Sequence, residues 1–243
     1  MYNSRITDDL ELLTCPALEE HGVPHAFTSR HNGFGERAHG PDDHAALARA
    51  LNLDTLATMK QVHGRDIHSI ADSATPPECD GMVTDEPGLG LVVHTADCLP
   101  MLMWAENANA VSAVHAGWHG TLANVAAAAV EKLMADKAAS AEELHIVIGP
   151  AIRRCCFEVG DEVVEAFVDA GRAVEVISWP GPRQRRHVDL IEDNRRQLIA
   201  SGVRPERIYD SGLCTSCENE RFYSYRKEGK GVGRLLGVIA VKS

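Results

Sequence analysis

Three short segments each carry one side chain that commonly binds metal ions, placed where an apolar run ends in a turn. The segments are Gln61-Val-His63-Gly64, Thr95-Ala-Asp97-Cys98-Leu-Pro100 and Val114-His115-Ala-Gly-Trp118. Strand ends that meet at one edge of a sheet are where binding sites are commonly built, so we expect these side chains to converge. Two imidazoles and one thiolate form the three-ligand set of a catalytic zinc ion, which keeps its fourth position open. His63, Cys98 and His115 are therefore candidate zinc ligands, although a single His or Cys in an apolar strand is more often a core residue.

The same three donors leave two other kinds of chemistry open. Two His, one Cys and a weakly bound Met would suit an electron-transfer copper site, and Met101 and Met103 follow Cys98 closely. A multicopper cluster is not expected, because none of the 12 histidines forms a His-x-His pair. Alternatively, Cys98 could be the nucleophile of a cysteine hydrolase, with His63 or His115 as its base.

Two aspartates next to these segments are candidates for proton transfer. Asp80 and Asp97 could act as general acid or base in a zinc-assisted reaction. Either could instead belong to a turn or orient a neighbouring ligand, and Asp97 directly precedes Cys98. His119 lies four residues after His115, but Gly117 between them argues against a continuous helix that would let both face one metal ion.

The remaining cysteines include one pair with a recognisable spacing. Cys214-Thr-Ser-Cys217 has the spacing of a redox motif or of half a zinc site. No second pair with structural-zinc spacing accompanies it, because Cys155 and Cys156 are adjacent. The total of seven cysteines is odd and their spacing is irregular, so we expect these four residues to be ordinary thiols.

The elements that must position these residues alternate between helix and strand. Apolar runs over 89–98, 100–105 and 110–117 suit strands that are buried on both faces. Residues 121–137 are rich in Ala and predict a helix. Asp189 is expected to cap a helix that ends at Ser201, with Gly202 beyond it. We also expect a helix over 10–22, a loop over 30–41, and strands over 174–179 and 221–225. One α/β (α+β layered) domain over residues 1–243, with a mixed sheet packed between helices, fits this pattern.

Composition excludes several classes of protein. The 24 basic and 35 acidic residues give a formal net charge of −11, which disfavours partners such as nucleic acid or an anionic membrane. No apolar run is long enough to span a bilayer. The polar N-terminus lacks the apolar centre of a signal peptide, so a cytoplasmic protein is expected. The sequence is compatible with a monomer or a homodimer.

Seven motifs occur together in an order that resembles a known family. They are Gln61-Val-His-Gly64, Cys79-Asp-Gly-Met-Val-Thr-Asp85, Thr95-Ala-Asp-Cys-Leu-Pro100, Ala113-Val-His-Ala-Gly-Trp118, Ile148-Gly-Pro-Ala151, Cys156-Phe-Glu-Val-Gly160 and Phe222-Tyr-Ser-Tyr-Arg226. This set resembles the YfiH-type family, also called the laccase-domain or polyphenol oxidase family, over about residues 55–240. The resemblance implies a layered α/β domain with zinc held by His63, Cys98 and His115.

The resemblance also implies an activity. Members of the family are described as purine nucleoside phosphorylases that act on adenosine, inosine, guanosine and methylthioadenosine, with adenosine deaminase activity in addition. Copper-dependent phenol oxidation and a link to peptidoglycan quality control are also associated with the family. The implied partners are therefore a purine nucleoside and phosphate, with zinc as the cofactor and copper as the alternative.

Three basic residues are candidates for holding phosphate. Arg30 and Arg226 lie in segments that match the family, and their planar guanidinium groups suit an oxyanion. The family usually has Arg after Ala-Gly-Trp, where this sequence has His119. If that Arg holds phosphate, His119 must replace it as a weaker, pH-dependent donor.

Overall fold

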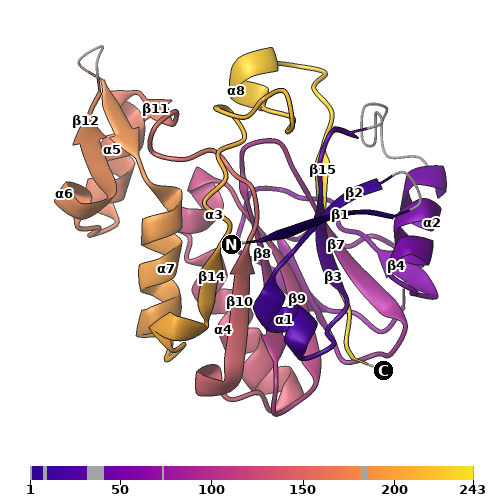
Figure 1. The fold of residues 1–243 in the computed structure, drawn as a ribbon. Helices are drawn as coiled ribbons and strands as arrows, with labels where there is room; N and C mark the ends of the chain where they lie inside the picture. The colour runs from indigo at the N-terminus through magenta and orange to yellow at the C-terminus, as the bar shows by residue number, and fades with distance from the viewer. Residues whose placement is uncertain (1, 8–9, 32–40, 73, 182–184, 243) are drawn as a thin grey trace.

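Two six-stranded sheets lie face to face at the centre of the computed structural model, which describes residues 2–7, 10–31, 41–72, 74–181 and 185–242 (Figure 1). In spatial order, the first sheet consists of β1 (Asn3–Thr7), β2 (Leu10–Thr14), β3 (His25–Thr28), β15 (Leu235–Ile239), β7 (Leu89–Thr95) and β4 (Thr55–Ala57). The second sheet consists of β14 (Ile208–Asp210), β10 (Leu144–Ile148), β8 (Leu99–Ala105), β9 (Ala110–Ala116), β6 (Gly81–Thr84) and β5 (Ile67–Ser69). Both sheets are mixed, with parallel pairs such as β4–β7 and β10–β14 beside antiparallel ones.

Helices cover the outer faces of both sheets. The outer face of the second sheet packs against α4 (Val125–Lys137) and α7 (Leu190–Ala200). The outer face of the first sheet packs against α2 (Pro41–Ala50). The predicted layered α/β fold with mixed sheets between helices is confirmed, and the structure divides the sheet into two stacked layers.

Strand β8 shows why its sequence is apolar throughout. Met101 and Met103 face the helices, whereas Leu102 and Trp104 face the first sheet, and all four side chains are buried. Successive side chains of a strand point to opposite faces, so a strand between two apolar layers needs apolar residues at every position. The continuous apolar runs in the sequence are therefore β8 and β9 of the second sheet and β7 of the first sheet.

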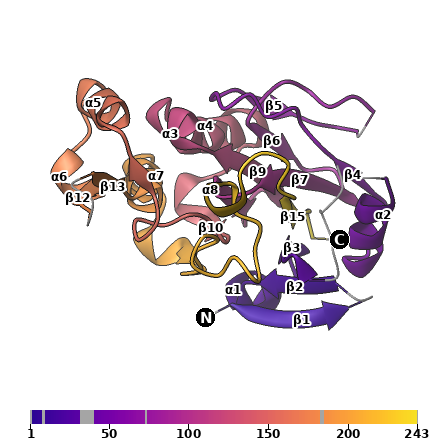
Figure 2. The ribbon, with the colours of Figure 1, turned by 90° about the horizontal axis from the view of Figure 1, so that it is seen from above.

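A smaller lobe lies beside α7 and α3 (Trp118–Leu122) (Figures 1 and 2). It contains a three-stranded sheet with its own hydrophobic cluster, and Leu190 of α7 belongs to that cluster. Its elements are β11 (Glu158–Val159), β13 (Arg186–Val188), β12 (Ser178–Pro180), α5 (Asp161–Asp169) and α6 (Val174–Ile177). Among the described residues, the remaining short helices are α1 (Pro16–Glu20), η2 (Ala141–Glu143), η3 (Pro205–Arg207) and α8 (Tyr225–Glu228).

Several expected elements differ from the structure. The helix expected over 10–22 is wrong in its first part, because Leu10–Thr14 pairs with both β1 and β3 as strand β2. Residues 174–179, expected as a strand, begin with the one-turn helix α6. Residues 221–225, also expected as a strand, form a turn and an irregular segment that end in the first residue of α8.

Other boundaries are close to expectation. The helix expected over 121–137 is two helices, since Asn124 takes a left-handed conformation between α3 and α4. Asp189 caps α7 as predicted, because its carboxylate accepts a hydrogen bond from the Glu192 N–H at 3.1 Å. Most of the loop expected over 30–41 lies outside the described residues. Within the described part of the chain, no helix is both long and apolar enough to cross a membrane.

Candidate metal centre

The three predicted ligands come together from two loops and one strand end at one edge of the stacked sheets. His63 lies on the loop after β4, Cys98 in the turn between β7 and β8, and His115 near the end of β9. Their donor atoms all lie within 4.8 Å of one another. His63 is exposed, Cys98 is half-buried and His115 is only 2% exposed. A metal ion at this point would thus be anchored from inside the protein and reachable from outside.

Asp80 organises two of the three ligands. Its carboxylate is fully buried and accepts a hydrogen bond from His115 Nδ1 at 2.8 Å. The same carboxylate accepts backbone N–H groups of the ligand loop, from His63 at 2.9 Å and from Gly64 at 2.5 Å. A carboxylate behind a ligating imidazole fixes its tautomer and ring orientation. With Nδ1–H donating to Asp80, the other ring nitrogen of His115 remains to face the ligand group.

The ligand loop is also held to the first sheet and to α3. The side-chain amide of Gln61 makes two hydrogen bonds of 2.8 Å with the backbone of His94 in β7. A Cβ at Gly120 would lie 2.9 Å from the Gly64 carbonyl oxygen, so glycine permits α3 to approach this loop. His63 itself has a φ of 61°, which a tight turn imposes on it.

Gly117 leaves a cradle among the three donors. A Cβ at this position would lie 3.2 Å from His63 Cδ2 and 3.3 Å from Cys98 Sγ. The space next to the donors is therefore open because residue 117 has no side chain. Together with the donor set and the carboxylate behind His115, this cradle shows that the residues present fit a metal ion.

The electrostatics of the group favour a thiolate at Cys98. Burial raises the pKa of this thiol, but hydrogen bonds from His115 and His63 and their charges outweigh burial and lower the pKa to about 6. Burial lowers the pKa of His115, but Asp80 and the Cys98 thiolate raise it to about 9. Without metal, the Cys98 thiolate and the protonated His115 thus form an ion pair. The thiolate is also the form of cysteine that binds a metal ion.

A cavity of about 420 Å³ opens in front of the three donors. Trp118 and Phe157 contribute aromatic faces to it, Ile152 and Leu190 contribute aliphatic surface, and Tyr225, Arg226 and Arg234 contribute polar groups. Volumes of roughly 300–1,000 Å³, apolar walls and a few polar groups are typical of small-molecule sites.

Asp97 lines the same cavity, but both of its carboxylate oxygens have partners. One accepts the Thr215 hydroxyl at 2.6 Å and the other accepts the Arg226 backbone N–H at 2.7 Å. Asp80 is likewise fully occupied. These hydrogen bonds favour a structural role for Asp80 and Asp97, in which they orient neighbouring ligands and loops, over a role in proton transfer.

Of the predicted phosphate ligands, Arg226 lines the cavity and the other two do not. Arg30 forms an ion pair with Glu228 at 3.1 Å and lies over the Tyr223 ring. His119 is exposed, and its ring contacts the Trp118 ring at 3.6 Å between centroids, with the two planes tilted by 30°. Met101 and Met103 are buried between β8 and the helices, outside the cavity lining.

Sequence reasoning missed Arg234, which lines the cavity just before β15. It lies in a Gly-rich segment whose only local signal was that of a turn. The backbone carbonyls of Val232 and Gly233 accept hydrogen bonds from its guanidinium group at 2.8 and 3.1 Å, which fixes its direction.

Comparison with known proteins decides the family. The family model for multi-copper polyphenol oxidoreductase laccase matches residues 36–242. The chain belongs to this family. It is 35% identical over 201 residues to purine nucleoside phosphorylase YlmD of Geobacillus stearothermophilus, covering 78% of this chain and 73% of that protein. It is also 35% identical over 202 residues to adenosine deaminase RL5 from an unknown prokaryotic organism, covering 79% of this chain and 77% of that protein.

Solved structures of relatives share the fold. The crystal structure of YlmD from Geobacillus stearothermophilus superposes with a TM-score of 0.88 at 28% identity, covering 98% of each chain. The hypothetical protein YfiH of Bacillus licheniformis gives a TM-score of 0.87 at 26% identity, covering 98% of this chain and 99% of the other. The stacked-sheet architecture is therefore that of the laccase-domain family.

Removing the carboxylate behind His115 tests the organisation of the site. Asp80→Asn should weaken zinc binding by about 10- to 100-fold, the usual effect of losing such a partner. Both oxygens of Asp80 accept hydrogen bonds from N–H groups. In the asparagine variant an NH₂ group replaces one of these oxygens, so some of the N–H donors lose their acceptor. Competition with a chelating dye measures the affinity, and Asp169→Asn on exposed α5 is the matched control. Equal affinities in the two variants would contradict the role given to Asp80.

The ion pair predicts a pH profile for Cys98 in the metal-free protein. Iodoacetamide reacts with the thiolate, so alkylation of Cys98 should reach half its maximal rate near pH 6. Cys79 serves as an internal control, because burial raises its pKa to about 11 and it should not react in this range. Peptide mass spectrometry follows each cysteine, and added zinc should protect Cys98. A Cys98 profile like that of a free thiol would contradict the ion pair.

Proposed function

We propose that this chain is a zinc-dependent purine nucleoside enzyme. It phosphorolyses adenosine, inosine, guanosine and methylthioadenosine, and it deaminates adenosine. The observation that carries the proposal is the position of the His63, Cys98 and His115 donors in a cavity that also has aromatic and guanidinium walls. Relatives named purine nucleoside phosphorylase and adenosine deaminase support purine nucleosides as the substrate class.

Within this proposal the three donors hold zinc, and the chain positions them. Bound zinc would act as a Lewis acid, which lowers the pKa of a coordinated water to about 7. Asp80 keeps His115 in the tautomer that presents its second nitrogen to the site. Gly117 keeps the space between the donors open. Three protein donors leave a position for substrate, which is the construction of a catalytic rather than a structural site.

The cavity walls give each part of the substrate a partner. The rings of Trp118 and Phe157 offer apolar faces to a purine base. Arg226 and Arg234 are the guanidinium groups of the lining, and planar forked donors suit phosphate. We therefore place phosphate near Arg226 and Arg234, and give no phosphate role to Arg30 or to the exposed His119.

Copper-dependent phenol oxidation is the second candidate, because the family description names copper and a His₂Cys donor set also suits that metal. Among the described residues, however, the candidate metal groups are this one and a group of four cysteines, and neither is a histidine cluster. A multicopper oxidase has no place for its further copper ions in the part of the chain described.

A cysteine hydrolase, acting in the peptidoglycan quality control that is associated with some members of the family, is the third candidate. In space, Cys98 contacts His115, which contacts Asp80, so the three could act as nucleophile, base and orienting carboxylate. The pKa of Cys98 is also lowered to about 6. His63 distinguishes the two interpretations, because it adds a second imidazole to the thiolate and completes a metal site. Metal content therefore separates the hydrolase from the zinc enzyme.

The proposal predicts two zinc-dependent reactions in one site. Protein loaded with zinc should convert adenosine to inosine without phosphate and release adenine when phosphate is added. Cys98→Ala should lose both activities, and Cys79→Ala, which alters a buried cysteine outside the lining, should keep them. Chromatography of the products is the measurement. Turnover unchanged after complete removal of metal would contradict zinc dependence, and phenol oxidation with copper alone would favour the second candidate.

Arg226 should separate the two reactions. In Arg226→Ala the backbone N–H that binds Asp97 remains, so only the guanidinium group is lost. A missing charge-assisted hydrogen bond of about 1.5–3 kcal/mol should raise KM for phosphate about ten- to a hundred-fold. Deamination of adenosine should fall much less, because it uses no phosphate.

Steady-state kinetics with varied phosphate measures this effect. Arg196→Ala, which removes an exposed guanidinium group from α7, is the matched control. Equal losses of both activities would mean that Arg226 holds the nucleoside or the cavity wall. An unchanged KM would move the phosphate site to Arg234.

A further inference from the structure

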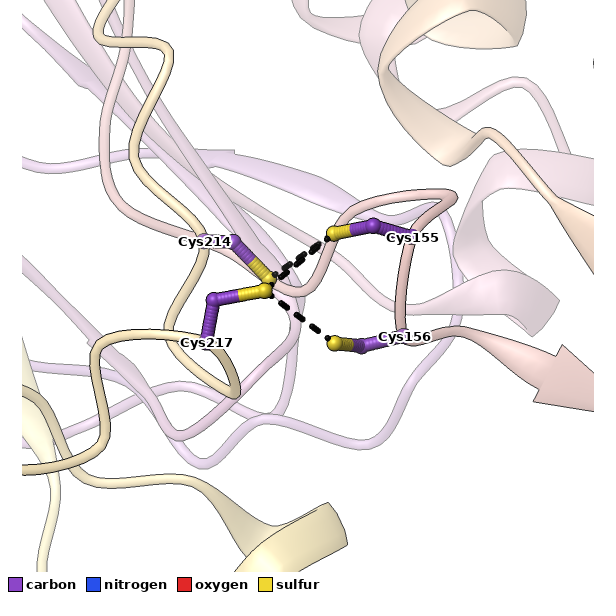
Figure 3. A group of neighbouring side chains, drawn as sticks. All are labelled: Cys155, Cys156, Cys214 and Cys217. Atoms are coloured by element: carbon purple, nitrogen blue, oxygen red, sulfur yellow. Dashed lines mark hydrogen bonds between the residues drawn. The ribbon is translucent and has the colours of Figure 1, made fainter.

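Four cysteines from two segments that are far apart in the sequence form a second cluster of thiols (Figure 3). Cys155 and Cys156 lie on the turn between β10 and β11, and Cys214 and Cys217 lie on the loop after β14. All four Sγ atoms lie within 4.8 Å of one another. The expectation of ordinary thiols, based on the adjacency of Cys155 and Cys156, did not anticipate this arrangement.

The spacing within the cluster is that of metal ligands and not of disulfides. Sγ of Cys155 lies 3.5 Å from Sγ of both Cys214 and Cys217, and Cys156 Sγ lies 3.4 Å from Cys217 Sγ. A disulfide bond is only about 2.05 Å long and joins one pair. Four sulfurs at the roughly 2.3 Å zinc–sulfur distance, placed tetrahedrally, are about 3.8 Å apart. The contacts measured here are close to that edge length, and they link all four residues into one network.

Backbone groups around Cys214 hold its sulfur in place. The N–H groups of Cys217, Arg153 and Ser216 donate hydrogen bonds to this sulfur. Hydrogen bonds from backbone amides to a coordinating atom fix its orientation. This ligand is therefore held in place by the loop on which it lies.

We propose that Cys155, Cys156, Cys214 and Cys217 bind one zinc ion as a closed, structural four-thiolate site. Soft thiolate donors select zinc among the common divalent ions, and four protein ligands leave no position for substrate. Binding releases the thiol protons to solvent and changes no oxidation state. Cys155 and Cys217 are exposed, so the ion can enter from outside.

The cluster lies where two segments of the chain contact the cavity wall. The Thr215 N–H of one segment donates to the Ala151 carbonyl of the other at 3.1 Å, and each segment also contacts Asp97 in the cavity lining. The Ile152 N–H donates to the Asp97 carbonyl at 2.8 Å, and the Thr215 hydroxyl donates to its carboxylate at 2.6 Å. The Arg226 guanidinium donates to the Cys156 carbonyl at 3.0 Å. Zinc at the cluster would thus fasten the wall that carries Asp97 and Arg226. This inference does not depend on the identity of the substrate.

Counting zinc with the first site disabled tests the proposal. His63→Ala combined with Cys98→Ala removes two donors of the cavity site and leaves the His115–Asp80 pair intact. Purified under reducing conditions, this variant should retain about one zinc per chain, whereas the wild type should hold about two. Adding Cys214→Ser and Cys217→Ser should remove the remaining ion, and adding Cys79→Ala instead should not.

Two further measurements do not depend on the folding of the protein that carries Cys214→Ser and Cys217→Ser. X-ray absorption at the zinc edge of the His63→Ala/Cys98→Ala protein should show four sulfur neighbours at about 2.3 Å. Cobalt in the same site should give thiolate-to-metal charge-transfer absorption. Absence of zinc from this variant, nitrogen or oxygen in place of sulfur, or disulfides among the four residues under reducing conditions would overturn the proposal. Iron bound to the four sulfurs would overturn the choice of zinc.

Discussion

The buried carboxylate of Asp80 is the interaction on which the candidate site depends. It directly precedes β6 of the second sheet, yet it accepts backbone N–H groups of the loop that leaves β4 of the first sheet and the imidazole of His115 on β9. A fully buried charge is tolerated only when hydrogen bonds replace its water, and here several donors do so. Those bonds, with the charge of His115, outweigh burial and hold the Asp80 pKa below its usual value. Two ligands from different layers are thereby oriented by one residue that need not touch a metal or a substrate.

Asp97 has a similar task on the other side of Cys98. Its φ of 93° turns the chain sharply at the end of β7, in a region that aspartate tolerates better than most residues do. Its carboxylate and carbonyl then bind three separate segments, through Thr215, Arg226 and Ile152. The position of the thiolate is therefore determined by loops far away in the sequence.

The features predicted from sequence were those set by local chemistry. The apolar runs of β8 and β9, the Asp189 cap and the three metal-capable side chains beside turns each depend on a few neighbouring residues. Leu10–Thr14 was assigned wrongly because its side chains suit either a helix or a strand, and pairing with β1 and β3 decides between them. Arg30 matched a family motif, but Glu228, 198 residues later, binds its guanidinium group. Arg234 gave no signal beyond that of a turn. Partners from distant segments decide these cases, and spacing rules do not describe them.

The two cysteine-containing groups differ in how many donors they present, and that difference separates their chemistry. His63, Cys98 and His115 provide three donors around the cradle at Gly117, so substrate can approach. The other group provides four thiols, which would complete the coordination of zinc and leave it inert. Asp97 connects the groups, because it precedes Cys98 in the chain and binds Thr215, the neighbour of Cys214. A site with an open coordination position needs rigid surroundings that keep its three donor atoms at fixed distances from one another. A closed four-thiolate site in the neighbouring segments would provide that rigidity without competing for substrate.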